Sequence, residues 1–91
     1  MDEPVRLPID GVLDLHTFRP DEIGKLIREY VTECRLRGIH VIRIIHGKGT
    51  GQLRLGVHAL LKKMPEVDSF RLADQALGGW GATLVTLKSP D

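Results

Sequence analysis

The 91-residue sequence contains a single cysteine and few aromatic residues. The lone Cys34 excludes an intramolecular disulfide and a zinc site built from several cysteines, which fits a reducing cytoplasm. Because aromatic residues make up only 4% of the chain, leucine, isoleucine and valine have to form the core. No apolar run approaches the roughly 18 residues of a membrane span, and no signal peptide precedes the first predicted strand. We therefore expect a cytoplasmic protein with no membrane partner.

The chain also has little net charge, but its charged residues are unevenly distributed. The formal net charge is +1. Residues 1–22 carry six acidic and two basic side chains, whereas residues 23–63 carry nine basic and two acidic ones. A basic segment of this kind favours a polyanionic partner such as DNA or RNA. The alternative is that these lysines and arginines only solvate the outer faces of two helices.

The pattern of apolar residues predicts one domain with alternating strands and helices. Residues 1–10 are an extended lead-in, residues 11–88 form the domain, and residues 89–91 are a tail. The predicted elements are a strand from Val12 to Leu15, a helix from Pro20 that ends at Gly38, a strand from Ile39 to Ile45, a helix from about Gln52 to Lys63, and strands from Val67 to Leu72 and from Ala82 to Leu87. The order β-α-β-α-β-β predicts an α/β two-layer sandwich with two helices and a mixed four-stranded sheet.

Two histidines follow predicted strands. His16 ends the first strand and His46 ends the second. If these strands are parallel neighbours, both histidines lie at one edge of the sheet, where strands are about 4.8 Å apart and α/β sheets bind ligands. Asp14 shares a strand face with His16 and can fix its tautomer. Asp14, His16 and His46 are therefore candidate catalytic residues, although both histidines can instead simply bond to loop backbone. His40 and His58 lack this context and are predicted to lie at the surface, with the alternative that His58 lies along the second helix beside the groove.

A glycine-rich loop joins the second strand to the second helix. Its three glycines permit positive φ angles and let a ligand approach the backbone. Unbonded N–H groups at the start of a helix attract anions, and basic side chains add to that attraction. The predicted phosphate-binding residues of this segment are Gly47, Lys48, Gly49, Thr50, Gly51 and Arg54. The alternative is that the glycines only make a tight turn.

The only tryptophan, Trp80, stands among three glycines just before the last predicted strand. An exposed tryptophan can stack on a base of single-stranded nucleic acid, a contact worth roughly 1–3 kcal/mol. It can equally cap the core or contact a partner domain. Trp80 is therefore a candidate nucleic-acid-binding residue, and a structural role for it is equally favoured.

Three motifs, in this order, resemble the Smr (small MutS-related) domain family. They are Leu13-Asp14-Leu15-His16, His46-Gly47-Lys48-Gly49 and Gly79-Trp80-Gly81-Ala82-Thr83-Leu84-Val85. The three together are specific, whereas any one alone is weak, and the resemblance covers nearly the whole chain. It implies a two-layer α/β sandwich similar to the C-terminal domain of a bacterial translation initiation factor. The histidine at position 16 resembles the stand-alone members of the family.

The resemblance implies nicking or endonucleolytic activity on DNA or RNA. It implies that Asp14 and His16 are the catalytic pair and that the loop beginning at His46 binds the substrate. Two positions depart from the family pattern. Thr17 stands where glycine is usual, and its side chain is expected to change the turn or to narrow access to His16. Arg19 stands where a threonine helix cap is common, and arginine caps a helix poorly.

The expected reaction is phosphodiester hydrolysis at the glycine loop. The loop amides, Lys48 and Arg54 would stabilise the phosphate, His16 would act as general base, and His46 would protonate the leaving oxygen or bind the phosphate. RNA carries its own 2′-hydroxyl nucleophile and would need no metal. DNA would favour a water activated by a divalent ion such as Mg²⁺ or Mn²⁺, although no residue cluster assures such a site.

Other functions remain open on the sequence alone. A non-catalytic nucleic-acid adaptor would use the same basic segment and loop without cutting. An enzyme acting on a small-molecule phosphate is less favoured, because a small sheet with two helices leaves little room for a deep pocket. The choice between DNA and RNA stays open, as does the choice between a monomer and a weak dimer.

Overall fold

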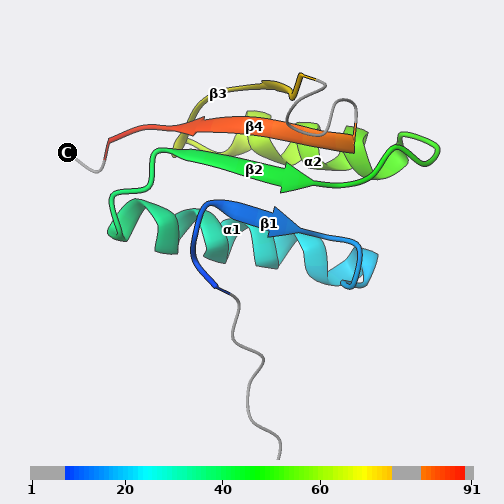
Figure 1. Ribbon diagram of the computed structural model, residues 1–91, viewed down its shortest axis with the longest axis horizontal. Helices are drawn as coiled ribbons and strands as arrows, with labels where there is room; N and C mark the ends of the chain where they lie inside the picture. The colour runs from blue at the N-terminus through cyan, green and yellow to red at the C-terminus, as the bar shows by residue number, and fades with distance from the viewer. Residues whose placement is uncertain (1–7, 75–80, 90–91) are drawn as a thin grey trace, which may run out of the picture.

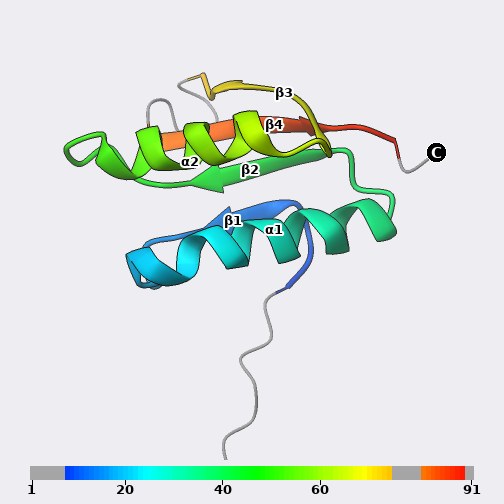
Figure 2. The ribbon, with the colours of Figure 1, turned by 180° about the vertical axis from the view of Figure 1, so that it is seen from behind.

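Six elements of secondary structure follow one another in the order that the sequence predicts. The computed structural model describes residues 8–74 and 81–89. The elements are β1 (Val12–Asp14), α1 (Pro20–Leu36), β2 (Val41–Ile45), α2 (Gln52–Lys63), β3 (Val67–Leu72) and β4 (Ala82–Leu87). The strands form one sheet, and both helices cover the same face of it (Figure 1 and Figure 2). The predicted α/β two-layer fold with a mixed four-stranded sheet is confirmed.

The sheet combines parallel and antiparallel pairs. The strand order is β1-β2-β4-β3. β1 runs parallel to β2, whereas β4 lies between β2 and β3 and is antiparallel to both. The carboxyl ends of β1 and β2 therefore meet at one edge of the sheet, as the sequence predicts. The beginning of β4 lies at this edge as well, because Ala82 pairs with Ile45.

The ends of α1 are set by a few backbone hydrogen bonds. No side-chain hydrogen bond from Arg19 caps the helix, but the Arg19 backbone N–H donates to Glu22 Oε1 at 2.9 Å. At the other end Gly38 adopts a φ of +75°, and the Ile39 N–H donates to the Cys34 carbonyl at 2.9 Å. Because that bond holds Ile39 in the helix cap, β2 begins at Val41 and not at Ile39 as predicted.

Aliphatic side chains from the sheet and both helices form the core. The most deeply buried side chains are Leu13, Leu15, Ile27, Val31, Cys34, Ile42, Ile44, Val57, Leu61, Thr83 and Val85. Burial raises the pKa of the Cys34 thiol, which keeps it protonated and unreactive. Tyr30 accepts a hydrogen bond from the Gly11 N–H at 3.0 Å and donates one to the Val12 carbonyl at 3.1 Å. Tyr30 thereby ties α1 to the start of β1.

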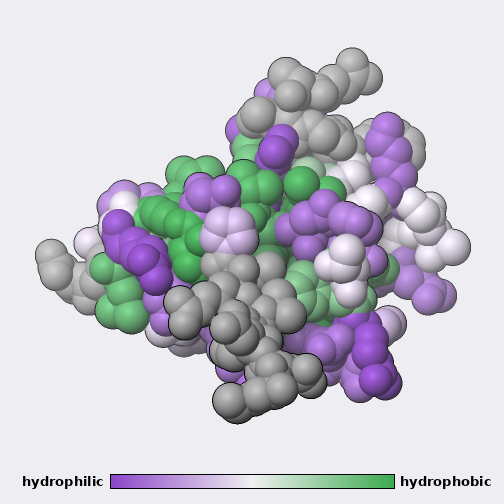
Figure 3. All heavy atoms as spheres, turned by 60° about the horizontal axis from the view of Figure 1, so that its bottom comes forward, coloured by the Kyte–Doolittle hydropathy of each residue, from purple (hydrophilic) through white to green (hydrophobic). Residues whose placement is uncertain are grey.

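The surface mixes apolar and polar side chains. Seen from the edge formed by β1 and α1, hydrophobic groups lie near the middle of the surface with hydrophilic ones around them (Figure 3). None of the described helices is long and apolar enough to cross a membrane. The predicted lead-in (residues 1–10) and tail (residues 89–91) fall largely outside the described residues, and Trp80 falls wholly outside them.

Candidate active site

The carboxyl end of β1 carries an aspartate–histidine pair that faces solvent. Asp14 Oδ1 accepts a hydrogen bond from the His16 backbone N–H at 3.0 Å and lies 2.6 Å from His16 Nδ1. The side chains of His16 and Asp14 are 74% and 45% exposed. The backbone bond from His16, followed by the ring bond, holds the pKa of the Asp14 carboxyl below its usual value. Because a carboxylate only accepts hydrogen bonds, Nδ1 of His16 carries the proton, and Nε2 of the neutral ring is free to accept one.

Thr17 occupies the turn position where the family pattern has glycine. Among the residues that the structure describes, only glycines have a positive φ, so Thr17 fits this turn without left-handed strain. Thr17 is exposed, and the side chain of its neighbour His16 stays largely exposed. The expected narrowing of access to His16 is therefore not found.

The glycine loop is tied to the residue that precedes β4. The backbone N–H groups of His46 and Gly47 both donate to the Gly81 carbonyl, each at 2.9 Å. Gly47, Gly49 and Gly51 have φ angles of +81°, +28° and +87°, a region that L residues with side chains avoid. The Gly47 amide is therefore not among the loop amides that can bind a ligand. The four amides that follow it donate to no protein acceptor in the described part of the chain.

Polar and basic side chains lie against this loop. A Cβ atom placed on Gly51 would come within 3.0 Å of Arg54 Nη2, so the guanidinium lies against the loop backbone. Thr50 Oγ1 accepts a hydrogen bond from the Gln52 N–H, the first amide of α2, at 3.4 Å. Lys48 adds a second positive charge within the loop itself. The structure thus brings the predicted residues 47–51 and Arg54 together.

Beneath the loop, three side chains form a hydrogen-bonded chain. His46 Nε2 lies 2.8 Å from Thr83 Oγ1, and His58 Nε2 lies 2.7 Å from the same oxygen. His46 Nδ1 lies 3.0 Å from the Gly47 carbonyl oxygen. His46 is 8% exposed and Thr83 is fully buried. The His58 ring also packs on Phe70, with ring centroids 4.9 Å apart.

The Gly47 carbonyl sets the direction of this chain of hydrogen bonds, because a carbonyl oxygen only accepts. His46 Nδ1–H donates to Gly47, so Nε2 of the neutral ring accepts from the Thr83 hydroxyl. His58 Nε2–H then donates to the Thr83 oxygen. Burial lowers the pKa of His58, and His46 and two nearby basic side chains lower it further. His58 is therefore neutral at neutral pH, and its Nε2–H tautomer donates to the Thr83 oxygen.

His16 and His46 lie at the same edge of the sheet but on opposite faces. Ile44 is fully buried on the helix side of the sheet and pairs with Leu13. Asp14 is the residue that follows Leu13 in β1. Side chains alternate along a strand, so Asp14 and the ring bonded to it face the open side. The His46 ring bonds to Thr83, which pairs with Ile44 on the helix side. The expected approach of both imidazoles to one substrate group is not found, since both ring nitrogens of His46 are bonded inside the protein.

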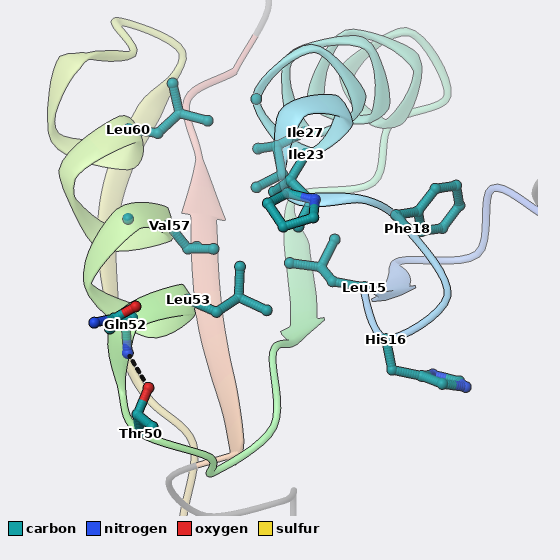
Figure 4. Close-up of a pocket in the computed structure, with 13 residues that line it drawn as sticks. Leu15, His16, Phe18, Ile23, Ile27, Thr50, Gln52, Leu53, Val57 and Leu60 are labelled. Atoms are coloured by element: carbon teal, nitrogen blue, oxygen red, sulfur yellow. Dashed lines mark hydrogen bonds between the residues drawn. The ribbon is translucent and has the colours of Figure 1, made fainter.

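A groove between the two helices opens at the same edge. It has a volume of about 630 Å³, and Thr50 and Gln52 lie at its α2 side. Its apolar lining includes Leu15, Ile23, Ile27, Leu53, Val57 and Leu60. His16 borders the groove, but its ring points away from it (Figure 4). Since aliphatic walls do not suit a phosphate, the basic loop is the better anion site.

Sequence reasoning missed Thr83 and His58 as partners of His46. The sequence pattern places His58 at the surface, yet it is half-buried and bonded to Thr83. A signal for Thr83 existed, because it shares a strand face with Val85 and Leu87. A polar side chain on a buried face needs a hydrogen-bond partner. No comparable signal marks His58, whose partner depends on how α2 packs on β4.

The described residues contain no ready-made metal centre. Within residues 8–74 and 81–89, no group of three or more histidine, cysteine, aspartate or glutamate side chains is placed to hold a metal ion. Asp14 and His16 alone would supply two ligands. Metal dependence therefore stays a prediction, and so does the nucleic-acid contact of Trp80, which lies outside the described residues.

Curated relatives resemble this chain over most of its length. The Smr domain family matches residues 13–88. The chain is 43% identical over 76 residues to endonuclease MutS2 of Brevibacillus brevis and 44% identical over 77 residues to endonuclease MutS2 of Solidesulfovibrio magneticus. These matches cover 84% and 85% of this chain but 10% of each relative. The chain therefore spans a tenth of the length of these relatives.

Two solved structures share the fold. The Smr domain of Thermus thermophilus MutS2 matches with a TM-score of 0.81 and 33% identity, over 87% of this chain and 99% of that one. YdaL, a stand-alone small MutS-related protein from Escherichia coli, matches with a TM-score of 0.80 and 26% identity, over 87% and 65%. The likeness extends to a domain of a larger protein and to a stand-alone protein alike. The chain belongs to the Smr domain family.

Proposed function

We propose that this Smr domain binds DNA or RNA and cleaves its phosphodiester backbone, with His16 as the general base. The observation that carries the proposal is the 2.6 Å contact between Asp14 Oδ1 and His16 Nδ1 in a solvent-exposed position. It leaves Nε2 of His16 ready to accept a proton from an attacking hydroxyl or water. The names of the MutS2 relatives, which are endonucleases, support the same reaction class.

The phosphate would bind at the loop that follows β2. Lys48 and Arg54 supply positive charge there, and the amides after Gly47 supply hydrogen-bond donors. Such fixed donors stabilise the charge that grows on phosphate oxygens in the transition state. His46 would act as a positioning residue, because it holds the Gly47 carbonyl and is anchored in turn by Thr83. This role replaces the proton donation expected from the sequence.

The attacking nucleophile would differ between RNA and DNA. On RNA, His16 Nε2 would take the proton of the 2′-hydroxyl, the O2′–P bond would form and the P–O5′ bond would break. The departing O5′ would take its proton from water, which reaches this exposed edge. On DNA, a water would have to attack, and a divalent ion bound near Asp14 would help to deprotonate it.

A second candidate is a nucleic-acid adaptor that does not cut. It is favoured by one observation, namely that His46 is bonded on both ring nitrogens and leaves His16 as the single exposed histidine of the site. This candidate predicts salt-sensitive binding with no cleavage products.

The experiment compares wild type with His16→Ala and with a matched control, His40→Ala. His40 is exposed and precedes β2 at the opposite end of the sheet. End-labelled DNA and RNA, each single- and double-stranded, are incubated with each protein, with and without EDTA. We expect cleavage by wild type and by His40→Ala, and a loss of about 10²- to 10⁴-fold in His16→Ala.

If wild type, His16→Ala and His40→Ala all show the same background cleavage and still bind nucleic acid in a gel-shift experiment, the domain is an adaptor and not a nuclease. The substrate that is cut and the response to EDTA separate the two nucleophiles. Cleavage of RNA that persists in EDTA fits the 2′-hydroxyl. Cleavage of DNA that EDTA abolishes fits a metal-activated water.

A further inference from the structure

The side of the sheet away from the helices carries a row of side chains that crosses all four strands. Val12 pairs with Arg43, Arg43 pairs with Leu84, and Leu84 pairs with Arg71. Val85, the residue after Leu84, is fully buried on the helix side. Because side chains alternate along a strand, the row lies on the open side, which faces the viewer in Figure 1.

The two arginines of this row stand on either side of Leu84. A strand spacing of about 4.8 Å puts their Cα atoms roughly 10 Å apart. Arg71 is exposed, whereas Arg43 is half-buried and already interacts with another group of the protein. Arginine binds phosphate oxygens through paired N–H groups and keeps its charge at any physiological pH. Arg71 is therefore the phosphate-binding group of this row, and Arg43 adds positive charge beside it.

A depression of about 280 Å³ includes part of this row. It is lined by Val41, Ser69, Phe70, Arg71, Leu84 and Thr86. Val41 is 54% exposed, so aliphatic surface is open to a ligand here. Hydroxyl and aliphatic groups next to a guanidinium suit a sugar that follows a phosphate. Asp68, in the bulge of β3 next to Ser69, is an acidic group near the depression, and Asp14 is another on the open side at the β1 edge.

The same face leads to the aspartate–histidine pair. Val12 belongs to the row, and Asp14 follows it by two residues on the same side of β1, roughly 7 Å further along the strand. His16 is bonded to Asp14. A polymer that crosses the row toward β1 therefore arrives at His16 Nε2, which is the atom assigned to proton transfer.

The shape of this face favours a single strand over a duplex. Proteins read duplex grooves with protruding elements such as a helix or a β-ribbon, and this open side is a sheet face. Single strands can lie across an open sheet, with basic side chains along the backbone. The row of Val12, Arg43, Leu84 and Arg71 contains no aromatic residue, so binding along it would depend on phosphates and tolerate many base sequences.

We propose that single-stranded nucleic acid crosses the open side of the sheet along this row. Arg71 binds a backbone phosphate, Arg43 adds positive charge beside the path, the sugars pass over Leu84, and the scissile phosphodiester reaches His16 at the β1 edge. The catalytic end of this path rests on the proposed function, whereas the binding path does not need cleavage to be tested.

The test uses Arg71→Gln and a matched control, Arg28→Gln, which removes an exposed arginine from α1. Fluorescence anisotropy measures the Kd of labelled single-stranded RNA and DNA oligonucleotides and of their duplexes at several salt concentrations. We expect Arg71→Gln to raise the Kd for single strands roughly fivefold and to lower the slope of log K against log salt by about 0.7. Arg71→Lys is expected to keep the slope, and Arg28→Gln to leave the Kd unchanged.

An unchanged Kd in Arg71→Gln, or an equal loss in Arg28→Gln, would overturn the path. An equal loss for duplex and single strand would overturn the assignment to single strands. Circular dichroism of each variant separates a lost contact from a lost fold. If wild type binds but never cleaves, only the proposed catalysis is contradicted. The ratio of the Kd of Arg71→Gln to that of wild type still tests the binding path.

Discussion

At the scale of single residues, one carboxylate oxygen decides what His16 can do. Asp14 Oδ1 receives both the backbone N–H and the ring Nδ1 of His16. The two side chains are exposed, so solvent screens the Asp14 charge and electrostatic attraction to the ring contributes little. The pair therefore matters because its hydrogen bonds fix the orientation and the tautomer of the His16 ring, even in water.

The first prediction concerns Asp14→Asn. An amide NH₂ can donate to Nδ1 and so favours the tautomer that carries its proton on Nε2, the wrong one for a base. We expect cleavage to fall by about 10²-fold while the Kd for nucleic acid changes little. Single-turnover rates with Asp21→Asn, another exposed aspartate, provide the control. A rate equal to wild type in Asp14→Asn would remove the carboxylate from the mechanism.

The second prediction concerns the buried chain from His58 through Thr83 to His46. The pKa of His58 is lowered in the folded protein, so the unfolded chain binds the proton more readily. Stability is therefore highest above the unfolded pKa of about 6.5 and falls as the pH drops through it toward the folded pKa. Glutamine keeps a donor to Thr83 without titrating, so His58→Gln should weaken this dependence.

Urea unfolding between pH 8 and pH 5 measures this effect. The stability of wild type should fall more steeply on acidification than that of His58→Gln. The exposed His40→Gln controls for the loss of any histidine and should follow wild type. Parallel curves for wild type and His58→Gln would show that proton binding at His58 is not coupled to folding.

At the scale of the elements, the end of α1 determines where β2 starts. Gly38 has a φ of +75°, and a Cβ atom there would meet nothing within 4 Å. The need for glycine at this position is therefore conformational and not steric. Gly24, inside α1, also has open space around it but has no positive φ.

The third prediction contrasts these two glycines. Gly38→Ala forces a side chain into the left-handed region and should lower the free energy of unfolding by about 1–2 kcal/mol. Gly24→Ala removes a flexible residue from a helix and should raise it by about 0.5–1 kcal/mol. Chemical denaturation of both variants checks the signs. Two changes of the same sign would contradict the assignment of Gly38 as the helix terminator.

Most elements could be predicted because local signals bound them. The range of α2, Gln52–Lys63, follows from Gly51 before it and Pro65 after it, since glycine and proline interrupt helices. The β-branched pattern alone predicts a start for β2 that is two residues too early, because the hydrogen bond from Ile39 to the α1 cap is not encoded in that pattern. Local periodicity predicts whether an element is a helix or a strand better than it predicts the first residue of that element.

At the scale of the whole molecule, the sheet separates two kinds of site. The helix side holds the buried chain that anchors the glycine loop, and the open side holds Asp14 and His16. The sequence correctly predicts that both histidines end at one edge, because that requires only parallel neighbours. It does not reveal their opposite faces, which depend on the pairing register and on the turn after Leu15. The burial of His46 likewise depends on β4 inserting next to β2.

The fourth prediction concerns the loop as the anion-binding end of the molecule. Lys48→Gln removes a phosphate-binding charge and should lower the slope of log K against log salt by about one for duplex and slightly less for single strands. Lys25→Gln on α1, whose ammonium lies 3.9 Å from Glu29, is the control and should leave the slope unchanged. Binding isotherms at several salt concentrations measure both slopes. Equal slopes in Lys48→Gln and wild type would show that Lys48 does not bind a phosphate.

Chemical rescue of His16→Ala by free imidazole tests the role of His16 as general base most directly. The His16 side chain is exposed, so imidazole can diffuse into the space that the substitution leaves. Single-turnover cleavage by His16→Ala should be slower than wild type by about 10²- to 10⁴-fold and should rise with added imidazole. A wild-type rate in His16→Ala without imidazole would contradict the assignment of His16 as the base.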